Sequence, residues 1–168
     1  MARLVADTSG LVSLGIAAGR DAEPLALCLE TYDVTVPETV VDELRDVAAY
    51  DDVHGRAADA VIDRRADLTV RSVELDAEFP LDDGENATVS LANEADAALL
   101  LCDEFTSLGL VHASLADTRL LTTPTLLSVL VRRDRLDADA AVDALDTIGG
   151  ARSWDANSYV QRARSLLE

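Results

Sequence analysis

Four acidic side chains in this chain stand where an α/β fold would bring them together. Asp7 ends a short apolar run, and Asp103 ends the apolar run of residues 97–102. Glu43 lies within a stretch of helical periodicity, and Glu85 stands at the start of another. Because ligands of open parallel sheets bind outside the carboxyl ends of the strands, the two strand-end acids point to one site. Carboxylates without Cys, His or Lys partners suit hard ions, so the cluster predicts a Mg²⁺ or Mn²⁺ site.

Each of these acids also has an ordinary structural explanation. Asp7, followed by Thr and Ser, could cap a helix, and Glu43 could lie on a solvated helix face. Glu85 at a helix start would interact favourably with the helix dipole, and an acid such as Asp103 is common at a strand end. The joint pattern of four acids in this order favours the metal site.

The elements that must position these acids alternate between strand-like and helix-like segments, which predicts a mostly parallel sheet covered by helices. We expect strands at 3–7, 33–37, 68–73 and 97–102, with a further strand around 109–112. Helices are expected at 9–19, 21–31, 38–50 and 52–66, and from 85, 122, 137 and 153 or 155 onward. Residues 1–168 read as one domain, with a core over about 3–130 and C-terminal helices over about 131–168.

Charge is the most unusual feature of the composition. There are 32 Asp and Glu residues against 14 basic ones, every basic residue is Arg, and the formal net charge is −18. Dense carboxylates keep a protein hydrated, and salt of about 1 M shortens the screening length to about 3 Å, so their repulsion becomes tolerable. This composition predicts a halophilic, archaeal source. In such salt the electrostatic attraction for phosphate is small for any protein, so acidity does not exclude a nucleic-acid partner.

The remaining reactive side chains give weaker signals. Cys28 and Cys102 lie in apolar segments without metal-ligand spacing, which predicts buried free thiols. His54 and His112 also lack ligand spacing, so surface or packing roles are expected. No apolar run approaches the roughly 20 residues that span a bilayer, and no signal peptide is recognised, so a cytoplasmic protein without membrane contact is predicted.

The four acids and their neighbours resemble the PIN domain family. The resemblance covers residues 3 to about 130, and the 18 positions from Glu85 to Asp103 match the helix and strand between the third and fourth acids of that family. The helix that begins near Thr123-Pro-Thr-Leu-Leu127 is similar to the branch with a Gly-Glu third motif. The motifs that carry the resemblance are Leu4-Val-Ala-Asp-Thr-Ser9, Val36-Pro-Glu-Thr-Val-Val-Asp-Glu-Leu44, Leu81-Asp-Asp-Gly-Glu85 and Ala98-Leu-Leu-Leu-Cys-Asp-Glu104.

The resemblance implies a three-layer α/β/α fold and a metal-dependent ribonuclease or nuclease, often the VapC-type toxin of a toxin–antitoxin pair. It further implies an RNA substrate, an antitoxin partner and a homodimer. Carried over to this sequence, the ligands of one or two Mg²⁺ or Mn²⁺ ions would be Asp7, Glu43, Glu85 and Asp103. Glu104 would be an auxiliary acid, and Thr8 or Ser9 would hydrogen-bond the metal shell.

Some residues fall outside that pattern. Arg132, Arg133 and Arg135 form the most basic region, which could touch RNA phosphate or an acidic segment of an antitoxin. The alternative is that they pair with the many surrounding acids. Trp154 and Tyr159 are expected to anchor the last helix to the core rather than to stack on bases.

Three other functions compete with the ribonuclease. A non-catalytic PIN-fold binding module is the nearest alternative, and the presence of all four acids favours catalysis over it. A response-regulator receiver domain normally needs a strand-end Lys, which this chain lacks. A phosphatase of the haloacid dehalogenase kind would have Asp-x-Asp after the first strand, whereas Asp7 is followed by Thr8 and Ser9.

Overall fold

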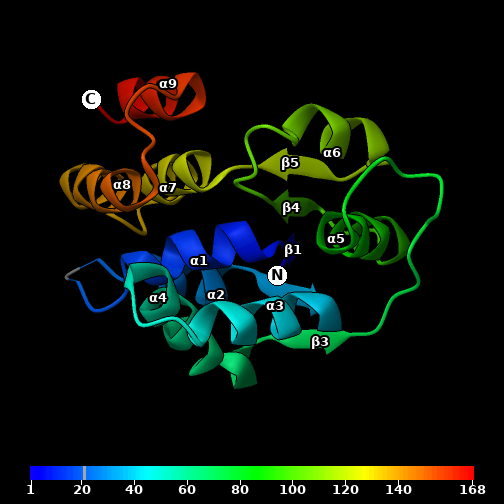
Figure 1. The fold of residues 1–168 in the computed structure, drawn as a ribbon. Coiled ribbons are helices and arrows are strands. Elements are labelled where there is room, and N and C mark those ends of the chain that lie inside the picture. The colour runs from blue at the N-terminus through cyan, green and yellow to red at the C-terminus, as the bar shows by residue number, and fades with distance from the viewer. Residues whose placement is uncertain (21) are drawn as a thin grey trace.

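A computed structural model describes residues 1–20 and 22–168 of the chain. At its centre lies a sheet of five strands in the order β3-β2-β1-β4-β5, and every neighbouring pair is parallel (Figure 1). The chain passes from β1 outward to β2 and β3, and then returns to the other side of β1 for β4 and β5. The carboxyl ends of β1 and β4 therefore flank the point where the strand order reverses, which is where such sheets bind ligands. The strands are β1 (Arg3–Ala6), β2 (Asp33–Pro37), β3 (Thr69–Arg71), β4 (Leu99–Leu101) and β5 (Arg119–Leu121).

Helices cover both faces of this sheet and form the C-terminal end of the described chain (Figure 1). They are α1 (Thr8–Ile16), α2 (Pro24–Thr31), α3 (Glu38–Ala48), α4 (Val53–Ile62), the short 3₁₀ helix η1 (Arg65–Asp67), α5 (Asp83–Glu94), α6 (Leu108–Ser114), α7 (Thr123–Arg132), α8 (Ala138–Arg152) and α9 (Ser158–Leu167). None of the helices within the described residues is both long and apolar enough to cross a membrane.

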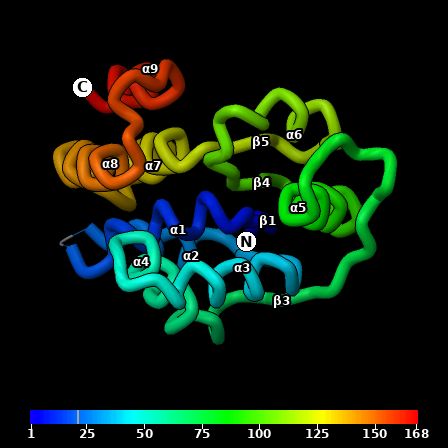
Figure 2. The backbone as a smooth tube through the Cα atoms, viewed as in Figure 1, coloured from blue at the N-terminus to red at the C-terminus, as the bar shows by residue number. Residues whose placement is uncertain are grey.

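The two faces of β1 bury their side chains in different cores, because successive residues of a strand point to opposite faces. Leu4 and Ala6 pack into the larger core with helices α1, α2, α3, α4, α7 and α8. Val5 packs into a smaller core with α5 and α6. Figure 2 shows the segment between β3 and α5 running along the outside of the molecule to connect the two sides. The predicted three-layer α/β/α fold is confirmed, and the sheet is entirely parallel.

Most of the expected elements are present, but one predicted strand is a helix, one strand is missing from the prediction, and the last helix begins later than expected. The strand expected around 109–112 is the helix α6. Its residues Leu108 and Val111 are buried and Leu110 is exposed, as in an amphipathic helix. Strand β5 is not among the predicted strands, because Leu120 and Leu121 stand between polar residues and form no longer apolar run such as the one that marks β4. The last helix begins at Ser158, since the side chain of Asn157 accepts hydrogen bonds from the backbone N–H groups of residues 159 and 160.

Several boundaries also differ from the prediction. Helix α5 begins at Asp83, two residues before Glu85, because Asp82 supplies the N-cap. The helix expected at 21–31 begins at Pro24, and its first expected residue lies outside the described part of the chain. The two cysteines are buried and free, as predicted.

The N-terminal helix approaches the sheet very closely. A Cβ atom at Gly10 would lie 2.6 Å from the Cγ atom of Leu101 in β4, so only Gly fits at this contact. The backbone N–H of Asp7 donates to the carbonyl of Leu101 at 2.9 Å. These two contacts fix the start of α1, and with it Asp7 and Ser9, against the end of β4.

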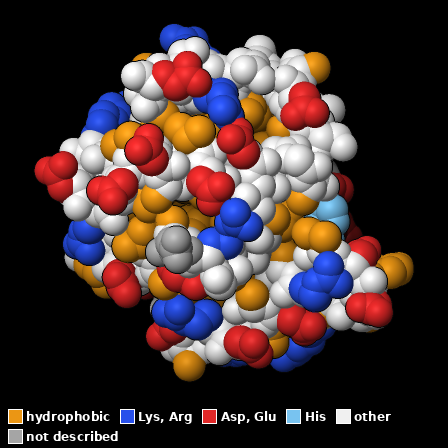
Figure 3. All heavy atoms as spheres, turned by 90° about the vertical axis from the view of Figure 1, so that its left-hand side faces the viewer, with side chains coloured by type: hydrophobic (Ala, Val, Ile, Leu, Met, Phe, Trp, Pro, Cys, Tyr) orange, Lys and Arg blue, Asp and Glu red, His pale blue; other side chains and the backbone are white. Residues whose placement is uncertain are grey.

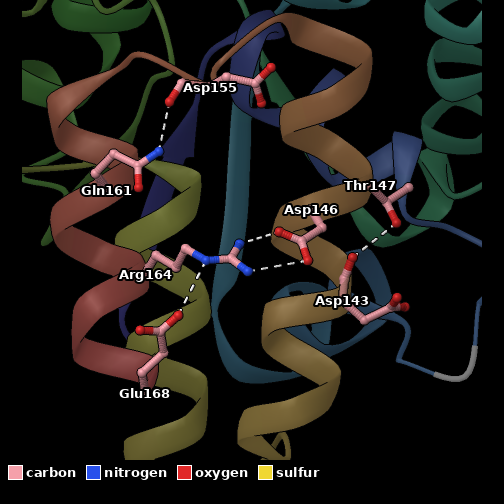
Figure 4. A network of polar contacts seen from close by, with 7 residues as sticks. All are labelled: Asp143, Asp146, Thr147, Asp155, Gln161, Arg164 and Glu168. Carbon is pink, nitrogen blue, oxygen red and sulfur yellow. Dashed lines mark hydrogen bonds and ion pairs between the residues drawn. The ribbon is translucent and has the colours of Figure 1, made fainter.

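Helix α9 lies against α7 and α8 through a buried stripe of Val160, Ala163 and Leu167. On its outer side the guanidinium of Arg164 lies between the carboxylates of Asp146 and Glu168 (Figure 4). Because exposed ion pairs contribute little, we assign most of the stability of this contact to the apolar stripe.

The two aromatic residues of the C-terminal region differ in burial. Trp154 is buried, as expected for an anchor. The prediction that Tyr159 also anchors the last helix in the core is wrong, because its side chain is 52% exposed. Tyr159 instead stacks on Phe105, with ring centroids 5.7 Å apart.

Candidate active site

A cavity of about 310 Å³ opens at the carboxyl ends of β1 and β4. Five of its lining side chains are carboxylic acids, and they come from segments far apart in sequence. We call it the acidic cavity and define it by the residues Asp7, Thr8, Ser9, Val12, Glu43, Val47, His54, Asp82, Glu85, Glu104 and Arg152.

Asp7 is the most deeply buried acid of this cavity, with 5% of the residue exposed. The hydroxyl of Ser9 donates to its Oδ2 atom at 2.7 Å, and the hydroxyl of Thr88 donates to Oδ1 at 3.3 Å. Burial raises the pKa of Asp7, and the hydrogen bonds from Ser9 oppose that rise. The carboxylate is thus held in one orientation while its negative charge is poorly solvated.

Glu43 reaches the cavity from α3. The hydroxyl of Thr8 donates to its Oε1 atom at 3.0 Å. Its carboxylate lies directly against Gly84, where a Cβ atom would be only 2.6 Å from Oε1. Burial is the main cause of the raised pKa of Glu43, and the negative charge of Asp7 adds to it. The glycine of the Leu81-Asp-Asp-Gly-Glu85 motif therefore makes room for an acid from another helix.

Glu85 stands in the first turn of α5. The carboxylate of Asp82, the N-cap, accepts a hydrogen bond from the backbone N–H of Glu85 at 2.8 Å. Burial raises the pKa of the Glu85 carboxyl to about 7, with further contributions from Asp82, Asp7 and Glu104. The acids of this cavity are therefore close enough to disfavour one another's ionisation.

This clustering has a direct effect on stability. Because the pKa of Glu85 rises from 4.5 to about 7 on folding, the folded chain binds more protons than the unfolded chain between these values. In chelator, the free energy of unfolding should therefore fall as pH rises from about 4.5 to about 7. Thermal melting across this range measures the effect, and Glu85→Gln should reduce the slope. A melting temperature that rises steadily through the same range would contradict this account.

Asp103 and its neighbour Glu104 occupy different environments. Asp103 is buried, and both of its carboxylate oxygens accept hydrogen bonds from Thr123, from the backbone N–H at 2.7 Å and from the hydroxyl at 2.6 Å. Its own backbone N–H donates to the Ser9 hydroxyl at 2.9 Å. Burial raises the pKa of Asp103, and the bonds from Thr123 oppose the rise. The structure does not place Asp103 among the residues that line the acidic cavity, whereas Glu104 is among them.

Two further residues of the cavity, Arg152 and His54, were not predicted as site residues, because nothing in the sequence around them indicates that they lie at the site. Arg152, at the end of α8, donates from Nη1 to the carbonyl of Ser9 at 3.0 Å and to the hydroxyl of Ser13 at 3.2 Å. It lies 145 positions after Asp7, so only the fold brings the two together. His54, for which a surface or packing role was expected, also lines the cavity.

The basic region of residues 132–135 lies elsewhere. Asp103 contacts the first residue of α7, while Arg132 is the last residue of that helix, about 14 Å further along its axis. Arg133 lies over the ring of Tyr32 at 5.7 Å, and Arg135 lines a separate cavity. Among the described residues, none of these three arginines forms an ion pair.

The chemistry of the acidic cavity fits a hard divalent ion. Its polar lining is dominated by carboxylates and the two hydroxyls of Thr8 and Ser9, and oxygen donors of this kind suit Mg²⁺ or Mn²⁺. Burial raises the pKa of Asp7, Glu43 and Glu85, and the charges of neighbouring acids add to the rise for Glu43 and Glu85. Within residues 1–20 and 22–168, no three acidic, His or Cys side chains stand close enough to form a ready-made ligand group.

Comparison with known proteins gives one result that bears on this cavity. A family model described as a PIN domain matches residues 3–168, so the match includes every residue of the acidic cavity. The search of curated proteins finds no match.

Proposed function

This chain belongs to the PIN domain family, whose members are generally nucleases, and on that premise we propose that it is a metal-dependent ribonuclease. One observation carries the proposal: Asp7, Glu43, Glu85 and Glu104 line a single cavity at the point where the strand order reverses. We assign these four carboxylates to one or two Mg²⁺ or Mn²⁺ ions. We assign to Glu104 the ligand role that the sequence resemblance gave to Asp103, because both carboxylate oxygens of Asp103 accept hydrogen bonds from Thr123.

The residues of the cavity have separate roles in the proposed hydrolysis of a phosphodiester. When bound, the metal ion lowers the pKa of a water molecule and offsets the charge that develops on the phosphate. Ser9 and Thr88 hold the carboxylate of Asp7 in place, and Thr8 holds that of Glu43. Arg152, anchored through Nη1, presents a positive charge to a phosphate oxygen that enters the cavity.

The direct test is cleavage of a mixed RNA pool in molar KCl. With Mn²⁺ or Mg²⁺ we expect cleavage, and with chelator we expect none until metal is returned in excess. Mixed DNA and double-stranded RNA of the same length serve as comparison substrates. Cleavage that persists in chelator would refute the metal dependence. RNA binding without cleavage, at any salt and with either metal, would support the non-catalytic module instead.

Gly84 offers a second test of the metal assignment. In Gly84→Ala the new methyl group displaces the Glu43 carboxylate, so Mn²⁺ affinity should fall about 10-fold or more. Stability should be unchanged or higher by up to about 1 kcal/mol, because the atoms displaced are the end of a flexible side chain and Ala favours the helix. Titration calorimetry with Mn²⁺ measures the first effect and thermal melting the second.

The matched control for this substitution is Gly150→Ala in α8. A Cβ atom at Gly150 meets no other atom within 4 Å, so Mn²⁺ affinity should stay at the wild-type value. Wild-type affinity in Gly84→Ala would remove Glu43 from the proposed ligand set.

We also propose that the protein is the VapC-type toxin of a pair, that it forms a homodimer, and that it comes from a halophile. Family membership supports the first proposal. An acidic segment of an antitoxin could bind the exposed arginines at 132, 133 and 135, which lie away from the acidic cavity. Figure 3 shows acidic side chains spread singly over one face with arginines between them, which supports the salt-adapted surface. Growth arrest on expression, relieved by the neighbouring gene, tests the toxin role.

A further inference from the structure

Arg152 lies among acids but is not paired with any of them. It lines the acidic cavity together with five carboxylic acids. Within residues 1–20 and 22–168, none of the ion pairs includes Arg152. A guanidinium that could move freely in a partly buried acidic site would turn to a carboxylate, because opposite charges attract more strongly there than in water. Other contacts must therefore keep the guanidinium of Arg152 away from the acids.

Two kinds of contact hold this guanidinium. Its Nη1 atom donates to the carbonyl of Ser9 at 3.0 Å and to the hydroxyl of Ser13 at 3.2 Å. Its central carbon lies over the ring of Trp154, 5.8 Å from the ring centroid. The indole ring is the aromatic group that attracts such a cation most strongly. All of these partners are neutral, so the positive charge of Arg152 is held in place without being neutralised.

The end of α8 brings Trp154 to this position. Ser153 follows the helix in the left-handed conformation, with φ at 58°, which is unfavourable for a residue that has a Cβ atom. The backbone N–H of Trp154 then donates to the carbonyl of Gly149 at 2.9 Å, as in a common type of helix end. The chain thus turns back toward α8, and the ring of Trp154 lies beside the guanidinium of Arg152.

Trp154 is held in turn by other aromatic rings. We call Phe105, Trp154 and Tyr159 the aromatic cluster. The ring of Phe105 meets the buried ring of Trp154 edge-on at 5.1 Å, and the ring of Tyr159 stacks on that of Phe105. Phe105 directly follows Glu104 in sequence. One packed unit therefore holds both the segment that carries Glu104 and the guanidinium of Arg152.

The charge of Arg152 acts on the nearby acids without a direct contact. Burial and the charge of Asp7 raise the pKa of Glu104, and the charge of Arg152 opposes that rise. Burial also raises the pKa of Asp103, and Arg152 is among the groups that oppose it. The guanidinium is thus close enough to influence Glu104, and a small rotation of its side chain would bring the two groups together.

We propose that Trp154 is a positioning residue of the site: it holds the guanidinium of Arg152 away from Glu104, so that this carboxylate stays free for a metal ion. The inference rests on the proposed ribonuclease function. It gives a role in that function to a residue that is not among the described residues lining the acidic cavity. Without the indole ring, Arg152 would pair with Glu104, and the ion pair would compete with the metal.

The test measures the binding of Mn²⁺ alone by titration calorimetry, on the full chain in molar KCl. Trp154→Leu removes the ring and Trp154→Phe retains an aromatic face, and each is made with and without Arg152→Gln. The matched control is Tyr32→Leu, because Tyr32 is also a buried ring beneath an arginine, 5.7 Å from it, but does not line the acidic cavity. Thermal melting in chelator confirms that each variant is folded at the temperature of the titration.

Trp154→Leu should raise the Kd for Mn²⁺ about fivefold, since a partly exposed ion pair competes by about that much, and Trp154→Phe should raise it less than about twofold. Tyr32→Leu should leave Kd unchanged. Adding Arg152→Gln to Trp154→Leu should return Kd to within about twofold of the Arg152→Gln chain, because the competing charge is gone. A wild-type Kd in Trp154→Leu would overturn the proposal. So would a Kd that stays raised after Arg152→Gln is added, because Trp154 would then act through the fold.

A second comparison leaves the buried ring in place. Arg152→Lys keeps the positive charge but lacks the planar group that stacks on a ring. The ammonium group should reach Glu104 and give a Kd for Mn²⁺ about threefold above that of Arg152→Gln. Equal Kd values in these two variants would overturn the proposal. Absence of metal binding in the wild-type chain would refute the proposed function and this inference with it, whereas wild-type binding without an effect of the variants refutes the inference alone.

The contact itself can be measured without metal. Trp154 is the single tryptophan of the chain, so the tryptophan fluorescence reports directly on its surroundings. Arg152→Gln should change the emission in metal-free buffer, because it removes the charge over the ring. Arg135→Gln should leave the emission unchanged, since Arg135 lines a separate cavity. Wild-type emission in Arg152→Gln would contradict the contact on which the proposal depends.

Discussion

Replacing Asp7 with Asn should lower kcat for RNA cleavage by about 10³-fold, which corresponds to about 4 kcal/mol in the barrier. The side chain keeps its shape, but it loses the negative charge that the proposed metal ion requires. In wild type the carboxylate is fixed by Ser9 and Thr88, so it is already oriented before metal binds. Initial rates with saturating Mn²⁺ measure the loss, and titration calorimetry measures the accompanying drop in Mn²⁺ affinity.

The same substitution should leave the fold intact. Burial raises the pKa of Asp7, which means that ionisation of this carboxyl is less favourable in the folded chain than in the unfolded chain. In chelator, Asp7→Asn should therefore melt at the wild-type temperature or above it, and added Mn²⁺ should raise the melting temperature of wild type only. Wild-type activity in the variant would remove Asp7 from the site, and a lower melting temperature in chelator would show that its charge has a structural role.

The second large effect concerns the adjacent acids Asp103 and Glu104. Glu104→Gln should lower kcat by about 100-fold or more with no fall in melting temperature, because Glu104 is exposed at the acidic cavity. Asp103→Ala should instead destabilise the protein by about 2–3 kcal/mol, since it leaves the buried N–H and hydroxyl of Thr123 without their acceptor. For a chain of this size the melting temperature should fall by roughly 4–12 °C.

A matched substitution separates the two roles. Thr123→Val removes one donor to Asp103 without touching the cavity, and it should reproduce part of the loss of stability while the surviving folded protein keeps its Mn²⁺ affinity. If Asp103→Ala lost Mn²⁺ binding at an unchanged melting temperature, Asp103 would be a ligand. Glu104 would then be auxiliary, as the sequence resemblance alone suggested.

Much of this arrangement could be predicted from local sequence. Asp7 follows a strand that is buried on both faces, and Glu85 follows a capping residue and a glycine, so both signals are contained within a few positions. The alternation of strands and helices was sufficient to predict a parallel sheet, and the parallel sheet in turn places strand-end acids together.

The remaining features depend on long-range geometry. Which of Asp103 and Glu104 enters the cavity depends on where β4 stops and on the hydrogen bonds that hold Asp103 against Thr123. That boundary cannot be located to one residue from composition. Arg152 enters the site only because α8 packs on α1, and no pattern around it in sequence differs from that of an ordinary helix end.

The order of strands has a consequence for the time at which the site forms. Strand β1 lies between β2 and β4, so during synthesis the first strand leaves the ribosome long before its second neighbour exists. The acidic cavity also needs Arg152, near the end of the described chain. Domains fold as their segments emerge, so a nascent chain lacks the complete site until Arg152 has been translated. Under the proposed function, the nascent chain would lack a complete site with which to cleave its own messenger before that point.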